Sequence, residues 1–584
     1  DIITGKGYIE LKGHDITNNV ELASGSIVVQ GSGNVINNSI ITGTNGNISG
    51  YNIINNDLIA FGEQTVLRAT DKLTNNAGRA IYGGTLLDIG FNTLENLSGE
   101  LLSTGVINLN GNYLLNQTGT IQSSNDINMN VTKIDNIGRV DGLNDYEIYY
   151  ETWDGQILTE AEVMSKWKNE EYGENKSNKL EGLYKTGLLA VLDRAEYQFL
   201  LANIFLEDLW DLNPTAVDYK HFTQGSVEGY FDRYPMDEST YIRTSSTQFP
   251  GVALKGKIRS NAITTYANIS AGNNISITAN ELNNKDGKIS AGNTAELTAD
   301  TIRNDTTLGD LVQLKDGVEY YKQEHYGSGS ARKYHVKYWR GIENGDQAYV
   351  TGQASVIEAR NLIINTGNLE LTSGVDTSKQ IITGSTTSGG LVSGKIVNTG
   401  VSSGTGIVNV VKNMTPIGEI IATGVLPIDP LSAQSSLFST SKDSNSKYLL
   451  ETRSQYINLG EFYGSDYYLS RIGYDENSDW NMARRLGDSY YEYLLVTRSI
   501  SDKLGTRFIN GLSDKELMKA MLDNSVELQK DLQLSVGVAL TPDQVKALKS
   551  DIIWYEYEVV NGEKVLVPKV YLSQATLSTI ETDG

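Results

Sequence analysis

Residue types that could carry catalysis or hold a metal ion are few in this chain. Its histidines are His14, His221, His325 and His335, and none falls in a metal-binding spacing such as His-Glu-x-x-His. The absence of cysteine excludes a cysteine nucleophile and a Cys-based zinc site. Asp475-Glu-Asn-Ser-Asp479 has the acidic character of a calcium loop but lacks the glycine and the terminal glutamate of an EF-hand. We therefore expect no metal and no cofactor.

Carboxylates leave one enzymatic alternative open. Some β-helices are polysaccharide lyases or hydrolases, and with 71 Asp and Glu residues no single catalytic pair can be picked out. The grooves of such enzymes need clustered Asp or basic residues along one strand face, whereas the regular repeats here carry mostly Asn, Ser and Thr. Two carboxylates about 5–9 Å apart in a groove would favour this alternative.

Aromatic side chains in two irregular segments are the candidates for binding. Tyr and Trp offer a large contact area at little entropic cost and dominate binding hot spots. The predicted receptor-binding residues are Trp153, Tyr172, Tyr230, Phe231 and Tyr234 in the first segment and Tyr334, Tyr338 and Trp339 in the second. The alternative for each residue is a place in a local hydrophobic core.

A repeat of about 20 residues organises the chain that carries these segments. It is clearest between positions 73 and 138, in pieces such as Leu73-Thr-Asn75-Asn-Ala-Gly78. The repeated asparagines are Asn75, Asn96, Asn116 and Asn136. A fixed period of this length, with short alternating strands and one turn per period, is typical of solenoids, because a single turn cannot bury its apolar face alone. The sequence predicts an all-β fold, a right-handed parallel β-helix.

The asparagine and glycine of each period are predicted as turn residues rather than ligands. Asparagine can bond its own backbone and tolerates a left-handed φ, and glycine reaches positive φ without strain. At about 20 residues per turn, residues 1–140 supply about seven turns and roughly 35 Å of rod.

Two insertions interrupt the rod. Residues 141–260 are aromatic and charged, with a capping box at Thr159-Glu-Ala-Glu162 that begins a helix to about Asn169, and a second helix is expected over Leu188–Leu212. The repeat resumes over 261–304, residues 305–350 predict a projecting hairpin, and solenoid turns return over 351–435. Because the period returns unchanged, the rod axis continues, and insertions in solenoids lie on one face.

Residues 436–584 predict a different, α+β module rich in tyrosine. Ser513-Asp-Lys-Glu516 and Thr541-Pro-Asp-Gln544 are capping boxes that each begin a helix. Asn561-Gly562 lies between two apolar runs and is the strongest short signal for a β-hairpin. The clustered tyrosines are Tyr448, Tyr456, Tyr463, Tyr467, Tyr468, Tyr474, Tyr490, Tyr491 and Tyr493.

The amino-acid composition argues against one class of binding partner. The formal net charge of −23 argues against nucleic-acid binding, because phosphate recognition needs a basic face. No charged-then-apolar signal segment opens the chain and no run of 18 apolar residues occurs. The sequence opens in mid-pattern at Asp1, so we expect it to be a piece of a longer protein.

Several motifs resemble a known family. The segment Ile269–Ala279 is similar to the haemagglutinin repeats of two-partner-secretion exoproteins. Later motifs resemble filamentous haemagglutinins and CdiA-type effectors of contact-dependent growth inhibition. These motifs are Lys447-Tyr-Leu-Leu-Glu451, Gly464-Ser-Asp-Tyr467, Arg484-Arg-Leu-Gly-Asp488, Gly537-Val-Ala-Leu-Thr-Pro542 and Val565-Leu-Val-Pro568.

The resemblance implies a secreted, monomeric, non-enzymatic rod segment on the bacterial cell surface, tethered at the outer membrane. It would bind an outer-membrane protein or lipopolysaccharide of a neighbouring Gram-negative cell and so enable toxin delivery, while a cognate outer-membrane transporter would act through parts not present here. The implied parts are the end of a haemagglutinin-repeat rod over 1–140, a receptor-binding region over 141–435 and the tyrosine-rich module over 436–584. The alternative is a virulence adhesin of the filamentous haemagglutinin kind that binds host glycan or protein.

Overall fold

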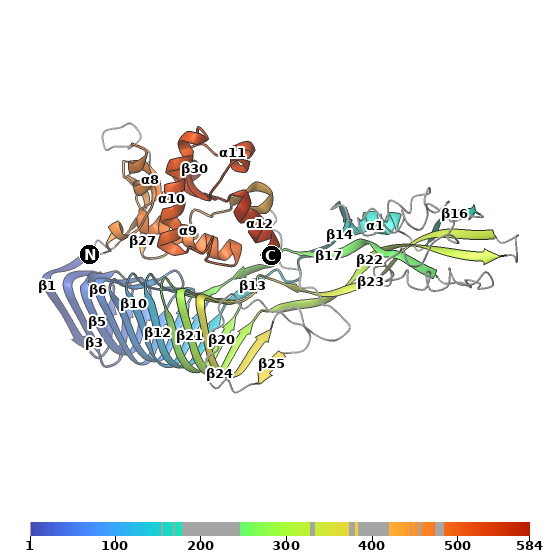
Figure 1. Cartoon of the computed structure of the whole chain (residues 1–584). Helices are drawn as coiled ribbons and strands as arrows, with labels where there is room; N and C mark the ends of the chain where they lie inside the picture. The colour runs from blue at the N-terminus through green and yellow to red at the C-terminus, as the bar shows by residue number, and fades with distance from the viewer. Residues whose placement is uncertain are drawn as a thin grey trace.

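A parallel β-helix forms the body of the molecule, with an antiparallel arm at one end and a helical module along one side (Figure 1). The computed structural model describes residues 2–152, 156–167, 170–177, 246–326, 333–372, 380–383, 420–443, 445–453, 457–473 and 484–583. The predicted helix over Leu188–Leu212, the candidate calcium loop at Asp475–Asp479 and the Gly/Ser/Thr-rich stretch after Thr383 lie outside these residues.

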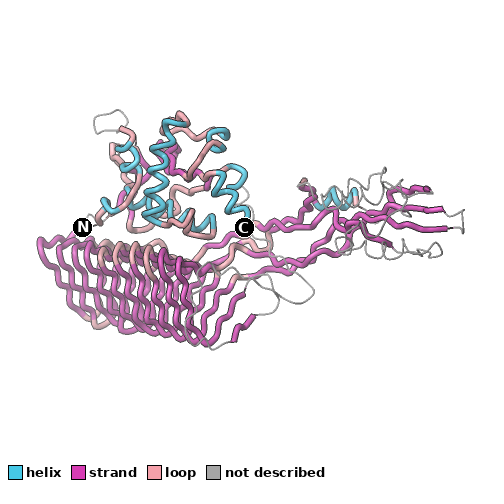
Figure 2. The backbone as a smooth tube through the Cα atoms, in the orientation of Figure 1, coloured by secondary structure: helices cyan, strands magenta, loops and turns pink. Residues whose placement is uncertain are grey.

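The rod is the predicted right-handed parallel β-helix, and its strands stack in register (Figure 2). The strands are β1 (Ile2–Gly13), β2 (Ile16–Asn18), β3 (Glu21–Gly31), β4 (Asn34–Asn37), β5 (Ile41–Asn55), β6 (Leu58–Asn75), β7 (Ala80–Gly83), β8 (Leu86–Leu97), β9 (Glu100–Ser103), β10 (Val106–Gln117), β11 (Thr120–Ser123), β12 (Asp126–Ile137), β19 (Ala267–Ala271), β20 (Ile275–Lys285), β21 (Gly287–Asp305) and β24 (Val356–Thr372). Equivalent residues pair one turn apart, as Ile107 does with Leu87 and Ile127. Their side chains face inward and are fully buried, and each contributes about 1.5–3 kcal/mol by leaving water.

One asparagine per turn joins its neighbours in a buried amide ladder. Each Nδ2 donates to the Oδ1 of the asparagine one turn on, at 2.6–2.9 Å. The ladder residues are Asn18, Asn37, Asn55, Asn75, Asn96, Asn116, Asn136, Asn284 and Asn304. The first seven lie within residues 1–140, which confirms the predicted seven turns. Their structural role is confirmed as well, but their bonds run mainly between turns rather than within one.

The ladder asparagines do not use the left-handed φ that this residue type tolerates. The residue two positions later adopts it instead, with φ of 49° at Ser98, 47° at Thr118 and 49° at Asp286. The glycine that follows is needed for space, since a Cβ on Gly99 would lie 2.4 Å from Nδ2 of Asn75. Glycine is therefore required because the amide ladder passes close to the backbone.

The rod axis continues across the first insertion, as the returning period predicts. Strand β11 pairs in parallel with β19, where Ile121 lies opposite Ile269, and β12 pairs with β20. The ladder also crosses the insertion, because Nδ2 of Asn136 donates to Oδ1 of Asn284 at 2.7 Å. Residues more than 140 positions apart in sequence thus occupy adjacent turns.

The arm is a six-stranded antiparallel sheet built from both insertions. Its strands, in spatial order, are β15 (Ile157–Thr159), β14 (Tyr146–Thr152), β17 (Ser246–Ser260), β22 (Leu308–Tyr326), β23 (Lys333–Thr351) and β16 (Glu170–Ser177). The predicted hairpin is confirmed as β22 and β23, and the predicted capping box at Thr159 begins α1 (Glu160–Lys166). At the base, β13 (Arg139–Asp141) and β18 (Ile263–Thr265) form a two-stranded antiparallel sheet.

The module folds around a second sheet and a group of helices. Its strands are β26 (Val425–Leu426), β27 (Phe438–Thr440), β28 (Tyr448–Thr452), β29 (Arg485–Gly487), β30 (Ile552–Val560) and β31 (Glu563–Tyr571), and its helices are η2 (Leu459–Glu461), α8 (Ser465–Arg471), α9 (Ser489–Leu504), α10 (Asp514–Asp531), α11 (Pro542–Lys546) and α12 (Gln574–Asp583). The hairpin at Asn561-Gly562 and the capping box at Thr541 are confirmed. The capping box at Ser513 is wrong: the residue is the N-cap of α10, but its side chain makes no capping hydrogen bond.

Two segments within 351–435 differ from the predicted solenoid turns. Strand β25 (Gln380–Thr383) pairs with β24 in antiparallel orientation, so it does not continue the parallel coil. Strand β26 pairs with β31, and Ile420, Leu426 and Ile428 belong to the hydrophobic core of the module. The change of partner explains the difference, because these apolar residues are buried by the module rather than by a rod turn.

Candidate functional site

Both insertions leave the rod at the same corner of the coil. In an uninterrupted turn, Nδ2 of Asn116 donates to the carbonyl of Gly119, and the flank strand β11 follows at once. At Asn136 the equivalent acceptor is the carbonyl of Ala267, and at Asn304 it is that of Ser355. Residues 139–266 and 307–354 therefore occupy one position in two turns, and a single regular turn with its corner at Asn284 and Gly287 lies between them.

This spacing explains why the insertions form one sheet. Corners two turns apart are separated by only about 10 Å along the axis, so chains that leave them can pair. Strand β17 of the first insertion pairs with β22 of the second, with Val252 opposite Val318. The result is one arm that extends away from the rod (Figure 1).

The base of the arm has its own small core. Tyr150, Val163 and Leu254 are buried together with Trp167, so α1 packs on β14 and β17. A second cluster of Ile258, Leu314, Ala348 and Val350 lies closer to the rod. The arm is thus a packed projection with a regular backbone.

The structure brings some of the predicted binding residues to adjacent strands of the arm. Tyr172 lies in β16 between Glu171, which pairs with Trp339, and Gly173, which pairs with Tyr338. Tyr334 lies further along β23, opposite Ser177. The other predicted residues, Trp153, Tyr230, Phe231 and Tyr234, lie outside the described residues.

Two further aromatic residues lie opposite these positions, and the sequence analysis did not name them as binding residues. Tyr320 and Tyr321 of β22 pair with Trp339 and Tyr338. The signal was available, because both tyrosines belong to the first strand of the predicted hairpin and a symmetric hairpin places them opposite the second.

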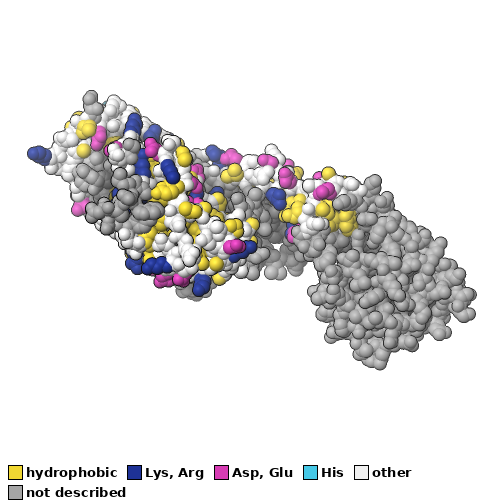
Figure 3. All heavy atoms as spheres, turned by 90° about the horizontal axis from the view of Figure 1, so that it is seen from above, with side chains coloured by type: hydrophobic (Ala, Val, Ile, Leu, Met, Phe, Trp, Pro, Cys, Tyr) yellow, Lys and Arg dark blue, Asp and Glu magenta, His cyan; other side chains and the backbone are white. Residues whose placement is uncertain are grey.

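The described part of the chain has neither a cluster of metal ligands nor a helix that could span a membrane. It contains no group of three His, Asp or Glu side chains arranged to hold a metal ion. None of its helices is long and apolar enough to cross a bilayer. Charged side chains of both signs are interspersed on the face seen from above (Figure 3).

The tyrosines of the module are mostly structural. Tyr468, Tyr490, Tyr491 and Tyr493 are at most 2 % exposed. Their rings pack on one another and on neighbouring aromatics, as Tyr468 stacks on Tyr555 at a centroid distance of 5.6 Å. These four side chains therefore stabilise the module and do not form a binding surface.

One buried acid lies among these rings. Glu492 accepts hydrogen bonds at Oε2 from the backbone N–H of Ser465 at 2.6 Å and from the Tyr555 hydroxyl at 3.0 Å, while Oε1 has no hydrogen-bond partner. Burial disfavours the carboxylate and raises the pKa of Glu492 to about 8. The two hydrogen bonds oppose this rise, and the nearby charge of Asp466 adds to it.

The module packs directly on one flank of the rod, a contact that the sequence does not predict. Its core includes outward-facing rod residues, namely Leu58, Ala60, Ala80, Tyr82 and Leu102. The ring of Tyr82 packs against Tyr490 at a centroid distance of 6.4 Å, and burial raises the pKa of Tyr82 to about 12. An available signal was the apolar character of these outward positions, where a solvated solenoid face would carry polar residues.

About a fifth of this chain is similar in sequence to known proteins. A stretch of 124 residues is 42 % identical to the 16S rRNA endonuclease CdiA of Enterobacter cloacae, which covers 21 % of this chain and 4 % of that protein. A stretch of 132 residues is 37 % identical to the filamentous hemagglutinin of Bordetella pertussis, covering 22 % and 4 %. The chain is similar to CdiA proteins and to a filamentous hemagglutinin.

A third relative is the protein adenylyltransferase and cysteine protease IbpA of Histophilus somni, 38 % identical over 135 residues, or 23 % of this chain and 3 % of that protein. The matched stretches span 3–4 % of the length of these relatives. No protein-family model matches the chain, and no solved structure does. The similarities to CdiA and to a filamentous hemagglutinin support a surface rod or adhesin segment.

Proposed function

We propose that this chain binds a receptor on a neighbouring Gram-negative bacterium and holds that cell for contact-dependent toxin delivery. The observation that carries the proposal is the shared corner: both insertions leave the rod there and combine into one projecting arm. A rod that only had to span a distance would need no such interruption. The arm is therefore the recognition element, and the stacked turns present it.

The register of the arm supports aromatic recognition. Tyr172, Tyr338 and Trp339 lie at neighbouring positions of two paired strands, and Tyr and Trp are enriched in binding hot spots. The rod, in contrast, satisfies its own polar groups through the amide ladder. Recognition by the arm leaves the regular turns free to keep their structural role.

The proposed partner class rests on the similarity to CdiA proteins. The receptor is an outer-membrane protein or lipopolysaccharide of the target cell, met by a monomeric chain tethered at the outer membrane of the producing cell. Export uses a cognate outer-membrane transporter that engages other parts of the full protein. We propose no catalytic role for this chain.

A second candidate function is adhesion to host glycan or protein. The similarity to a filamentous hemagglutinin, 37 % over 132 residues, supports it. Both functions use the arm, and they differ in the cell that carries the receptor.

Binding to a panel of cells tests the proposal and separates it from the second candidate. The fluorescently labelled chain is titrated on intact Gram-negative bacteria, on strains with truncated lipopolysaccharide, and on epithelial cells. We expect saturable binding to bacteria and a loss of at least tenfold in affinity for the Tyr338→Ala and Trp339→Ala double variant. Tyr51→Ala, which removes a half-exposed tyrosine from the rod, is the matched control and should bind normally.

Binding to epithelial cells alone would favour the host-adhesin function. Equal binding of the double variant and the native chain to bacteria would remove the assignment of recognition to this part of β23. Binding to bacteria that is lost only with truncated lipopolysaccharide would identify the receptor as the polysaccharide.

A further inference from the structure

Helix α9 of the module lies across the rod at the level where the arm is attached. The helix lies over a row of outward-facing rod residues, one per turn, which pair with one another along the axis. We call this row the track. The track residues, in axial order, are Tyr82, Leu102, Gln122, Ser270, Ser290 and Glu358. The first insertion separates Gln122 from Ser270 in sequence, so the track crosses the point where the arm leaves and re-enters the rod.

The length of the helix matches this track. Five steps between six stacked strands span about 24 Å at 4.8 Å each. Helix α9 has 16 residues, which gives it a length of about 24 Å at 1.5 Å per residue. The helix therefore reaches turns on both sides of the insertion.

On the N-terminal side of the insertion, contacts are apolar and then charged. Tyr490 at the start of α9 packs on Tyr82. Further along, Arg498 donates from Nη1 to Oε1 of Glu100 at 2.6 Å and from Nε to Oε1 of Gln122 at 2.9 Å. These contacts fix the helix to turns that precede the arm.

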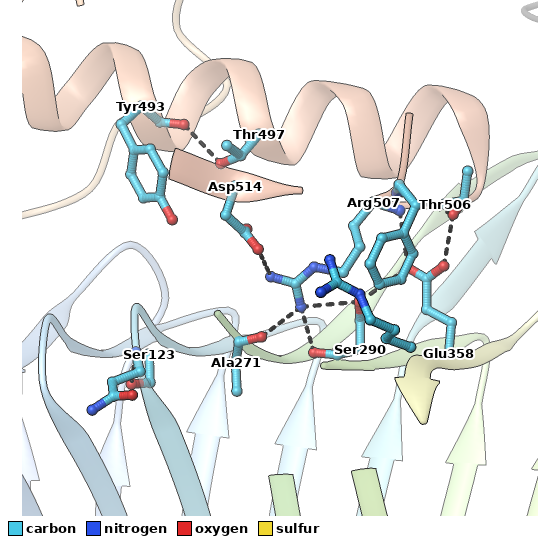
Figure 4. Close-up of polar contacts among 12 residues, drawn as sticks. Ser123, Ala271, Ser290, Glu358, Tyr493, Thr497, Thr506, Arg507 and Asp514 are labelled. Carbon is cyan, nitrogen blue, oxygen red and sulfur yellow. Dashed lines mark hydrogen bonds and ion pairs between the residues drawn. The ribbon is translucent and has the colours of Figure 1, made fainter. Parts of the chain in front are cut away.

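On the C-terminal side, the contacts are polar and largely buried. Nζ of Lys288 lies 3.1 Å from Oδ1 of Asp502, and the Lys288 side chain is only 2 % exposed. Oδ2 of Asp514 accepts from Nη2 of Arg507, so that guanidinium is charge-paired within the module. Nη1 of Arg507 donates to the carbonyls of Ala271 at 2.7 Å and Ser290 at 2.6 Å (Figure 4).

Glu358 extends this contact by one more turn. It accepts at Oε1 from the backbone N–H of Arg507 at 3.0 Å and at Oε2 from the hydroxyl of Thr506 at 2.8 Å. The hydroxyl of Ser290 donates to the same Oε1 at 3.0 Å. One segment of the module thus binds three consecutive turns, those of β19, β21 and β24.

Strand β19 is one of the places where a force on the arm would reach the rod. It has five residues, Ala267–Ala271, and it directly follows β18 at the base of the arm. Its side chains Ala267, Ile269 and Ala271 are buried, and its backbone pairs with β11 and β21. A force transmitted through β18 would act on this short strand. Arg507 binds the carbonyl of Ala271 at the far end of the strand.

We propose that α9 and the loop carrying Arg507 act as a splint that pins β19 and joins the two halves of the rod across the root of the arm. The occupant of the rod flank is this chain's own module. The proposal does not depend on which receptor the arm binds. It assigns the module the task of keeping the arm fixed to the rod.

Hydrogen–deuterium exchange of the full chain tests the splint. In Arg507→Ala, we expect amide exchange in β19 and in β13 and β18 to accelerate at least tenfold, while β3 and β5, which lie beyond the track, keep native rates. Lys519→Ala is the matched control, because Lys519 pairs with Asp523 inside α10, and it should leave β19 unchanged. Native rates in β19 of Arg507→Ala, or equal acceleration in β19 and β3, would overturn the proposal.

A charge swap guards against simple unfolding of the module. Arg498→Glu should accelerate exchange in β19, and the added change Glu100→Arg should restore it to within about twofold of native, because a reversed pair can form at the same 2.6 Å site. Exchange in β30 and β31 reports whether the module stays folded in each variant. If the double variant keeps β30 and β31 protected yet leaves β19 fast, the pair does not pin the rod and the proposal fails.

Discussion

The rod and the module satisfy buried polar groups in opposite ways. In the rod, each ladder asparagine finds its partner one turn away, so every turn solves the same problem with the same residue. In the module, each buried polar group has its own partners, and the arrangement does not repeat. Glu492, for example, accepts hydrogen bonds from Ser465 and Tyr555. The rod is therefore extendable, while the module has one arrangement and relies on the rod flank for part of its core.

This difference teaches how function is distributed along the chain. A repeat tolerates an insertion at a corner, because the ladder and the strands close again one turn later. A non-repeating module covers the flank beside that corner. Substitutions that affect one region and spare the other can test the distinction.

The largest effect is expected where the two regions meet. Tyr82→Ala removes a buried ring from the module core and leaves the inward rod residues untouched. Loss of a buried aromatic side chain costs about 3–5 kcal/mol. Here the loss destabilises the contact between the module and the rod. We expect exchange in β30 and β31 to accelerate while β8 and β10 stay protected. Equal loss of protection in all four strands would show that the two regions are not separable.

A slightly smaller effect is expected inside the ladder. Asn96→Leu leaves the carbonyl of Gly99 and Oδ1 of Asn116 without their donor, which should cost about 3 kcal/mol. Urea unfolding followed by circular dichroism measures it. Asn112→Ala, which removes an exposed asparagine pair with Asn92, is the control and should cost about 0.5 kcal/mol or less. Similar costs for both variants would contradict a special role for the buried ladder.

The module alone should respond to pH through Glu492. Its folded pKa of about 8 lies above the ordinary value of 4.5, so its stabilising contribution is fully present below pH 4.5 and is lost as pH rises through 8. Between pH 6 and pH 8 the module should lose about 2–3 kcal/mol. Glu492→Gln should abolish this dependence, measured by module exchange at each pH. A native slope in Glu492→Gln would assign the pH dependence to another group.

The smallest effect is expected for an exposed ion pair on the rod. Lys133 lies 3.6 Å from Glu281 and 3.7 Å from Asp135, and its side chain is 45 % exposed. Lys133→Ala should change rod stability by less than about 0.5 kcal/mol. The ion pair of Lys133 and Glu281 joins turns on either side of the first insertion. A larger loss of unfolding free energy in urea would mean that this pair stabilises the rod more than an exposed pair should.

The rod could be predicted from sequence because its information is local and repeated. The spacing of Asn96, Asn116 and Asn136 reports one turn each, and the same spacing resumes after the insertion. The orientation of those side chains could not be predicted, because a turn preference does not distinguish an outward asparagine from one buried in a ladder. Gly99 illustrates the point: its residue type was read correctly as a turn signal, but the reason is the space that Asn75 requires.

The arm and the module contact were only partly predictable for a different reason. The hairpin of β22 and β23 has strand signals on both sides of a glycine turn, so it was predicted. The pairing of β17 with β22 joins two insertions that are adjacent only once the coil is built, and the docking of Tyr490 on Tyr82 joins residues about 400 positions apart. No local pattern encodes such contacts.

The central claim is that the arm, and not the rod, carries recognition, and an armless chain tests it most directly. Removing residues 139–266 and 307–354 joins Gly138 to Ala267 and Thr306 to Ser355, which restores the regular corner spacing of Asn116 and Gly119. We expect the armless chain to keep its β-rich circular dichroism spectrum and to lose at least tenfold in affinity for intact target bacteria. Full binding by the armless chain would contradict the claim and place recognition on the rod or the module.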